Sequence, residues 1–226
     1  MDSEFARQYY ESAKRDHWWF RGRELLVAEL VNAYGTGGGV FLDLGAGVES
    51  LLPSEIPVVK LDLVVPDGVR GPFVRGSAES LPFRTGELGG VGLFDVLEHL
   101  DDPRKCLEET KRVTRPGGLV MITVPAHRWL WSRHDEVVGH KRRYSSSTLR
   151  GALEDVGLSI AWMSAFYGFL LAPALARRVL SLESPMTMPG PSVNRALSAL
   201  SQRSVRSALG KPSGFGLSLA AVAFVP

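Results

Sequence analysis

Residues 125–144 hold side chains suited to acid–base chemistry, because three of the five histidines in the chain lie there. His127, His134 and His140 fall within fourteen residues of one another, and Asp135 directly follows His134. A histidine has a pKa close to neutral, and a carboxylate beside it can hold its ring, so the pair can take a proton from a hydroxyl or an amine. We therefore predict His134 and His140 as candidate catalytic bases, with Asp135 as the residue that orients them.

Other roles remain open for the same segment. The three histidines and Asp135 lack the compact spacing of ligands on one helix, so we expect no metal site here. The basic residues at 141–143 could bind a phosphate or a carboxylate of a substrate, or could simply form a basic surface loop. We predict Trp131, Arg143 and Tyr144 as residues that bind the substrate.

A second candidate site is a glycine-containing turn that follows the short apolar run 40–44. Gly45 and Gly47 let the backbone turn sharply and approach a ligand closely, because they carry no Cβ. A dinucleotide-binding turn would carry a third glycine and receive a pyrophosphate at the start of a helix. Here Asp43 precedes the turn and Glu49 follows it. Carboxylates would repel a pyrophosphate, so the pattern favours a cationic ligand.

Asp62 lies nineteen residues after Asp43, at the end of a second apolar run. This spacing predicts a strand, a turn, a helix and a second strand. An acid at the end of the second strand can accept hydrogen bonds from both hydroxyls of a ribose. A surface acid at a strand terminus is the plainer interpretation of the same residue.

The elements that position these residues alternate along the chain. We predict one or two helices over 3–33, strands at 40–44, 58–63, 73–75, 91–96 and 119–124, helices at 103–114 and 147–156, and final strands at 158–162 and 217–225. Alternating strands and helices with acids at strand ends are typical of a doubly wound α/β sheet, which binds ligands at the carboxyl edge of its strands. We expect a Rossmann-like sheet that is mostly parallel, with an antiparallel last strand.

Length and composition favour one globular domain. The chain has 226 residues, of which 45% are hydrophobic and 22% charged, so disorder is not expected. Its single cysteine, Cys106, excludes an internal disulfide and favours a reducing, cytoplasmic location. The polar first residues predict neither a secretory nor a transit signal, and no uncharged apolar run reaches the ~20 residues of a membrane span.

The C-terminal part of the chain is basic. From residue 166 onward there are six basic residues and one acid, a net charge of +5, which leaves −3 for the rest of a chain whose total is +2. A net charge this small does not predict nucleic acid as a partner. A basic, apolar segment suits a membrane surface, an amphiphilic substrate or a homodimer face, and a solvated helix face explains it equally well. We predict an amphipathic helix with Val193, Leu197, Leu200 and Ala208 on one face, opposite Arg195, Gln202 and Arg206.

Five motifs in one order carry a family resemblance. They are Asp43–Gly47, Asp62, Ser77–Phe83, Leu93–Leu100 and Arg115–Gly118. Together they resemble class I S-adenosylmethionine-dependent methyltransferases of the group called type 11, over about residues 15–165. S-adenosylmethionine carries an ammonium and a sulfonium and no phosphate, in keeping with the acidic turn.

The resemblance also implies roles for individual residues in holding the cofactor. It places Asp43, Gly45 and Gly47 against the methionine part and Asp62 at the ribose. It places Ser77 and Ala78 at the adenine, and Phe94 and Asp95 beside the sulfonium. It makes the aromatic segment 17–23 a lid, with Trp19 and Arg21 near the cofactor, whereas packing of these aromatic residues on the sheet is the plainer interpretation. The implied layout is a single domain with a lid at 1–36, a cofactor-binding core at 37–166, a helical insertion at 167–213 and a last strand at 214–226.

Three features depart from the family pattern. Glu49 stands where a glycine is usual, and Ser77 stands where an acid usually accepts the adenine amine. Residues 64–72 read as a loop, too short for a crossover helix.

The leading interpretation is a methyltransferase that acts on a hydroxyl or an amine of a small molecule, such as a secondary metabolite, a saccharide or a lipid-linked acceptor. The alternative is a non-catalytic cofactor-binding module that acts as a regulatory or assembly partner. A nicotinamide-dependent oxidoreductase is disfavoured by Glu49 and by the missing third glycine.

Overall fold

A seven-stranded sheet organises the computed structural model, which describes residues 17–179 and 189–226. The strand order is β3-β2-β1-β4-β5-β7-β6, and β7 runs antiparallel to both of its neighbours while the other pairs are parallel. The strands are β1 (Phe41–Leu44), β2 (Val58–Asp62), β3 (Phe73–Arg75), β4 (Leu88–Phe94), β5 (Thr114–Pro125), β6 (Ser159–Phe166) and β7 (Ser218–Phe224). The predicted mostly parallel Rossmann-like sheet with an antiparallel last strand is confirmed.

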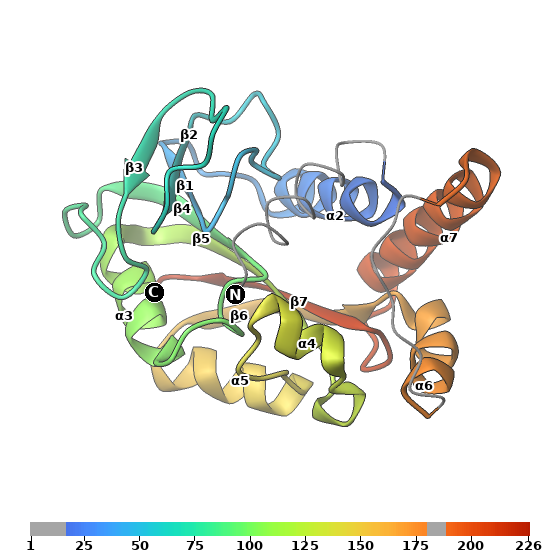
Figure 1. Cartoon of the computed structure of the whole chain (residues 1–226). Helices are drawn as coiled ribbons and strands as arrows, with labels where there is room; N and C mark the ends of the chain where they lie inside the picture. Colours follow the sequence, from blue (N-terminus) through green and yellow to red (C-terminus); the bar gives the residue numbers. More distant parts are fainter. Residues whose placement is uncertain (1–16, 180–188) are drawn as a thin grey trace.

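Helices cover both faces of this sheet (Figure 1). They are α2 (Trp18–Tyr34), α3 (Pro103–Val113), α4 (Arg133–Val138), α5 (Ser146–Asp155), α6 (Leu171–Val179) and α7 (Pro191–Gly210), with short 3-10 turns η1 (Arg128–Leu130) and η2 (Gly168–Leu170). Buried residues of α3 and α5 form one core cluster with the sheet, and those of α2 and α7 form a second. Among the described residues, no helix is long and apolar enough to cross a membrane.

The connection between β1 and β2 differs from the prediction. Residues 45–57, all of which the structure describes, form turns and bends instead of the expected helix. Pro53 and Pro57 restrict the backbone there, and the Asp43 carboxylate accepts hydrogen bonds from the Ser50 hydroxyl and the Leu51 amide. These bonds satisfy the backbone without a helix. The predicted helical segment before residue 17 lies outside the described residues.

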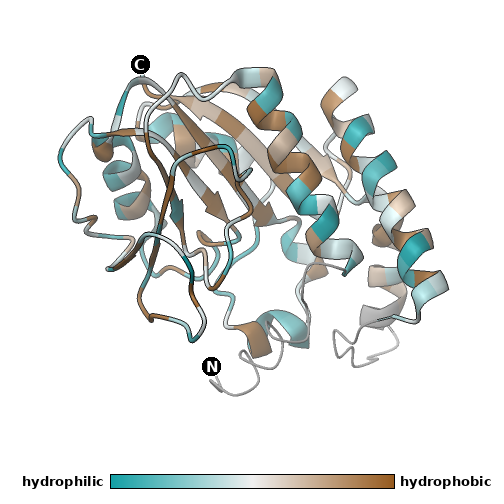
Figure 2. Cartoon of the chain, turned by 90° about the horizontal axis from the view of Figure 1, so that it is seen from above, coloured by the Kyte–Doolittle hydropathy of each residue, from teal (hydrophilic) through white to brown (hydrophobic). Residues whose placement is uncertain are grey.

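The buried face of α7 also differs from the prediction. Val193 and Leu200 are 55% and 45% exposed, whereas Ser198 and Ser201 are buried with Val205 and Ala208. The reason is close packing, because α2 and α7 lie side by side on the sheet (Figure 2). Small side chains are needed where two helix backbones approach closely. Contact of residues 167–213 with a membrane, a substrate or a second copy stays a prediction.

Gly22 marks the tightest point of this helix contact. A Cβ added at Gly22 would lie 2.0 Å from Ser201 Oγ and 2.3 Å from the Tyr167 hydroxyl. We expect Gly22→Ala to lower the free energy of unfolding by about 1–3 kcal/mol, measured by urea denaturation. The matched control is Gly151→Ala in α5, where a Cβ would meet no described atom within 4 Å. This control should gain up to about 1 kcal/mol from helix propensity. Equal effects at the two sites would contradict the tight contact.

Candidate functional site

The glycine turn and Asp62 meet at the carboxyl ends of β1 and β2. Gly45 and Gly47 have φ angles of 71° and 57°, which L side chains rarely adopt. A Cβ at Gly45 would lie 2.8 Å from Val96, while no described atom lies within 4 Å of a Cβ built at Gly47. The Gly47 amide donates a hydrogen bond to Asp62 Oδ2 at 3.3 Å. The structure therefore brings together the turn and the acid that the sequence singled out, with open space beside Gly47.

Asp43 supports this turn from inside the core. Its side chain is buried, and burial raises the pKa of Asp43 to about 7 against the hydrogen bonds from Ser50 and Leu51. Lys60 Nζ donates to the carbonyl of Val48 at 2.8 Å and fixes the same loop. The structure thus shows Asp43 holding the backbone of the turn, while Glu49 is exposed.

Ser77 and Ala78 follow β3 and are half-buried. The Ser77 hydroxyl accepts a hydrogen bond from the Glu79 amide at 3.2 Å, and the Ser77 carbonyl accepts one from Ser80. These bonds form a tight turn at the same edge of the sheet as Asp62. Ser77 therefore shapes the backbone of this edge.

The end of β4 carries a partly buried ion pair between Arg23 and Asp95. Asp95 adopts a φ of 58°, unusual for a residue other than glycine, and its Oδ2 lies 2.8 Å from Arg23 Nη2. Thr123 links the two, because its hydroxyl donates to Asp95 and accepts from Arg23 Nη1 at 2.9 Å. The guanidinium of Arg23 also lies 4.6 Å from the centre of the Trp19 ring. Phe94, beside Asp95, packs against the α2 side of the core.

Arg23 is the residue that the sequence analysis missed in this region. It is buried, whereas the predicted Arg21 lies on the exposed side of α2. Residues two positions apart on an α-helix are separated by about 200° around its axis, so the side chains of Arg21 and Arg23 point to opposite sides of α2. Arg23 stands three and seven positions before Leu26 and Leu30, on the apolar stripe, and this periodicity was the available signal. Trp19 packs on Tyr167 at 4.8 Å between ring centres and lies over Arg23.

Asp135 and His140 form a pair in the histidine-rich segment. Nδ1 of His140 donates to Asp135 Oδ1 at 2.8 Å, and Arg143 donates to both oxygens of the same fully buried carboxylate. Burial raises the pKa of Asp135, but the hydrogen bonds from His140 and Arg143 outweigh it and hold this pKa below its usual range. Asp135 is therefore an ionised carboxylate that fixes the His140 ring.

The other predicted residues of this segment lie around that pair. His134, on α4, has its ring centre 6.4 Å from that of His140, and His127 stacks on Trp129. Trp131 Nε1 donates to Glu136 at 3.5 Å. Arg143 donates hydrogen bonds to Asp135 and to the Ala126 carbonyl. Tyr144 is buried, and its hydroxyl lies 3.4 Å from the Leu97 carbonyl. Their role as substrate-binding residues stays a prediction.

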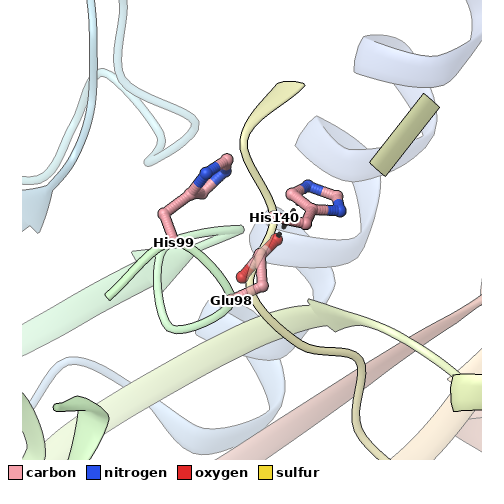
Figure 3. Close-up of side chains that lie close together, drawn as sticks. All are labelled: Glu98, His99 and His140. Carbon is pink, nitrogen blue, oxygen red and sulfur yellow. Dashed lines mark ion pairs between the residues drawn. The ribbon is translucent and has the colours of Figure 1, made fainter. Parts of the chain in front are cut away.

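Glu98 and His99 lie against His140 (Figure 3). One nitrogen or oxygen atom from each of the three side chains lies within 4.8 Å of the others. Glu98 is fully buried, and burial together with the charge of Asp95 raises its pKa well above the usual range. The pattern of histidine spacing pointed away from a metal here, because Glu98 and His99 lie about forty residues before His140 and are brought to it only by the fold.

Sequence comparison relates this chain to known methyltransferases. Residues 35–122 match the model of a methyltransferase domain family. An uncharacterised methyltransferase of Mycobacterium sp. (strain KMS) is 32% identical over 107 residues, 44% of this chain and 42% of that protein. A protein of Mycolicibacterium smegmatis named as an S-adenosylmethionine-dependent methyltransferase is 25% identical over 177 residues, 72% of this chain and 68% of that protein.

The fold is also found among solved structures. A crystal structure of an S-adenosylmethionine-dependent methyltransferase from Thermotoga maritima superposes with a TM-score of 0.66, at 14% identity, over 99% of this chain and 97% of that chain. At this identity the likeness concerns the fold. The chain spans 42% of the length of the Mycobacterium sp. relative.

Proposed function

Since the chain belongs to the class I S-adenosylmethionine-dependent methyltransferases through its domain at residues 35–122, we propose that it transfers a methyl group from S-adenosylmethionine to a small molecule. The observation that carries this proposal is the hydrogen bond that joins the Gly45–Gly47 turn to Asp62, with open space beside Gly47. The Asp62 carboxylate beside the turn and the exposed Glu49 suit a ligand with an ammonium and a sulfonium, and disfavour a pyrophosphate. The names of the relatives support an enzyme over a non-catalytic binding module.

The residues at the strand ends fit such a cofactor. Gly45 and Gly47 would let the backbone approach its methionine part, and the Asp62 carboxylate would accept hydrogen bonds from the ribose hydroxyls. Ser77 and Ala78 would line the adenine. Asp95, held by Arg23, would lie beside the sulfonium. Trp19 would cover the site, where exclusion of water favours transfer of a methyl group from a dispersed positive charge.

We place the acceptor at the end of β5, beside Asp135 and His140, and propose a hydroxyl or an amine as its reacting group. The acceptor atom forms a bond to the methyl carbon while the bond from that carbon to sulfur breaks. The electron pair of the broken bond stays on sulfur, and the proton of the acceptor passes to His140 Nε2 or to water. Placement of the two groups in line supplies much of the rate. Nε2 of His140 is the nitrogen left to act on the acceptor, because Asp135 holds Nδ1. Nε2 would act on the acceptor either directly, as a general base, or as a ligand of a bound cation.

Calorimetry tests the cofactor assignment directly. We expect S-adenosylhomocysteine to bind the purified protein and to raise its melting temperature, whereas NADH does neither. Asp62→Ala should weaken the binding of S-adenosylhomocysteine by about 1–3 kcal/mol through lost hydrogen bonds. Lack of binding by the unmodified protein at high micromolar concentration would overturn the proposal. A screen of hydroxyl- and amine-bearing small molecules, read out as S-adenosylhomocysteine formed, then identifies the acceptor.

A further inference from the structure

The cluster of Glu98, His99 and His140 joins two segments that the fold locks together. Glu98 and His99 follow β4, and His140 follows α4. The Lys141 amide donates to the Glu98 carbonyl at 2.7 Å, and His99 Nδ1 donates to the Gly139 carbonyl at 3.3 Å. These two bonds on either side of His140 set its position relative to Glu98. The cluster is therefore a built part of the fold and does not depend on one flexible loop.

Glu98 is the unusual member of the cluster. Its side chain is 0% exposed, and neither carboxylate oxygen accepts a hydrogen bond from any described residue. His140 Nε2 lies 3.9 Å from Glu98 Oε1, too far for a hydrogen bond. A buried carboxylate without hydrogen bonds is costly, because it has lost its water and gained no partner. Such a group needs either a proton or a cation beside it.

Both histidines are oriented as metal ligands usually are. A ligating histidine donates its other ring nitrogen to a carboxylate or a backbone carbonyl, which fixes the tautomer and the ring. His140 donates from Nδ1 to Asp135, and His99 donates from Nδ1 to Gly139. With Nδ1 as the donor, the neutral form of each ring has its lone pair on Nε2. Arg143 in turn holds both oxygens of Asp135, so the orienting carboxylate is itself fixed.

We propose that Glu98, His99 and His140 bind a divalent first-row transition metal ion, with Asp135 as the positioning residue for His140. Two imidazole nitrogens and one carboxylate are typical ligands of zinc, iron or manganese, whereas magnesium and calcium prefer oxygen ligands. The ion would neutralise the buried Glu98 carboxylate. His99 and His140 are partly exposed, so the cluster can be reached from solvent.

Three protein ligands leave coordination positions open. This step rests on the methyl transfer proposed above: we assign the open positions to an oxygen of the acceptor, which favours a hydroxyl over an amine as the reacting group. The metal would lower the pKa of that hydroxyl, and its proton would pass to water because His140 Nε2 is then a ligand. The position of the cluster suits the binding of the acceptor. Glu98 lies three residues after Asp95 in the chain, and we place Asp95 beside the sulfonium.

Cobalt binding tests the site without any acceptor. Untagged full-length protein is stripped with a chelator and titrated with Co²⁺, whose visible absorption reports nitrogen and oxygen ligands, and Zn²⁺ is titrated in parallel by calorimetry. We expect one equivalent to bind. Glu98→Gln and His140→Ala should lose the visible band, and Asp135→Asn should weaken affinity by about 10–100-fold. His134→Ala is the matched control and should keep the band.

The Glu98→Gln variant also distinguishes a role of Glu98 as a metal ligand from a purely structural role. It keeps nearly the same side-chain volume and cannot ionise, so the metal-free variant should melt at or above the temperature of the metal-free parent. A folded parent that binds neither ion, or binding that survives in both Glu98→Gln and His140→Ala, would overturn the metal site. S-adenosylhomocysteine binding is measured on the same samples. Its presence without metal binding would overturn only the metal site, and its absence with metal binding would overturn only the methyl-transfer proposal.

Discussion

Replacement of His140 by alanine should lower turnover by about 10²–10⁴-fold, while the affinity for S-adenosylhomocysteine changes little. His140 is fixed through Nδ1 by Asp135, and its Nε2 lies 3.9 Å from Glu98. Either as a general base or as a metal ligand, this nitrogen acts on the acceptor and not on the cofactor turn. The measurement is the rate at which S-adenosylhomocysteine forms with the acceptor found by screening.

His134→Ala is the matched control for this change. His134 belongs to the same segment, but its ring centre lies 6.4 Å from that of His140, and the Asp135 side chain is bonded to His140 and Arg143. We expect this variant to lose less than about tenfold in turnover. If the two variants lose activity equally, the pairing of Asp135 with His140 does not decide which histidine acts. If only His134→Ala loses activity, His140 is removed from the acceptor site.

The fold was predictable wherever a short apolar run ended at a turn or an acid. The run 73–75 became β3 with the predicted bounds, and the run 119–124 lies inside the longer β5. The helix expected between β1 and β2 did not form. Its spacing looked sufficient, but Pro53 and Pro57 and the buried Asp43 carboxylate stabilise a loop instead. A buried side chain that bonds a loop backbone leaves no periodic signal in the sequence.

The candidate site was predictable where its residues lie close together in the chain. Asp135 and His140 are five residues apart, and the structure pairs them. Glu98 and Arg23 were not predicted as site residues, because their partners lie far along the chain. Arg23 meets Thr123 across 100 residues, and Glu98 meets His140 only after β4 and α4 are in place. A sequence shows a buried charge only indirectly, as a charged residue on an apolar stripe.

Arg23→Met should lower the free energy of unfolding by about 2–3 kcal/mol, because it breaks a partly buried ion pair and leaves one charge behind. The Arg23 side chain is 4% exposed, whereas that of Asp95 is 31% exposed. Water can therefore reach part of the remaining carboxylate, which places the loss at the lower end for buried pairs. Methionine keeps much of the volume beneath Trp19, so the loss reports mainly the charge.

A double-mutant cycle with Asp95→Asn isolates that charge. The double variant should recover part of the stability lost in Arg23→Met, since no unpaired carboxylate remains, and urea denaturation of the four proteins gives the coupling energy. Arg21→Met, on the exposed side of the same helix, should change stability less. A coupling energy near zero would mean that Arg23 stabilises the protein by packing on Trp19 and Phe166. A clear coupling would show that α2 fixes Asp95, and with it the end of β4 where we place the sulfonium.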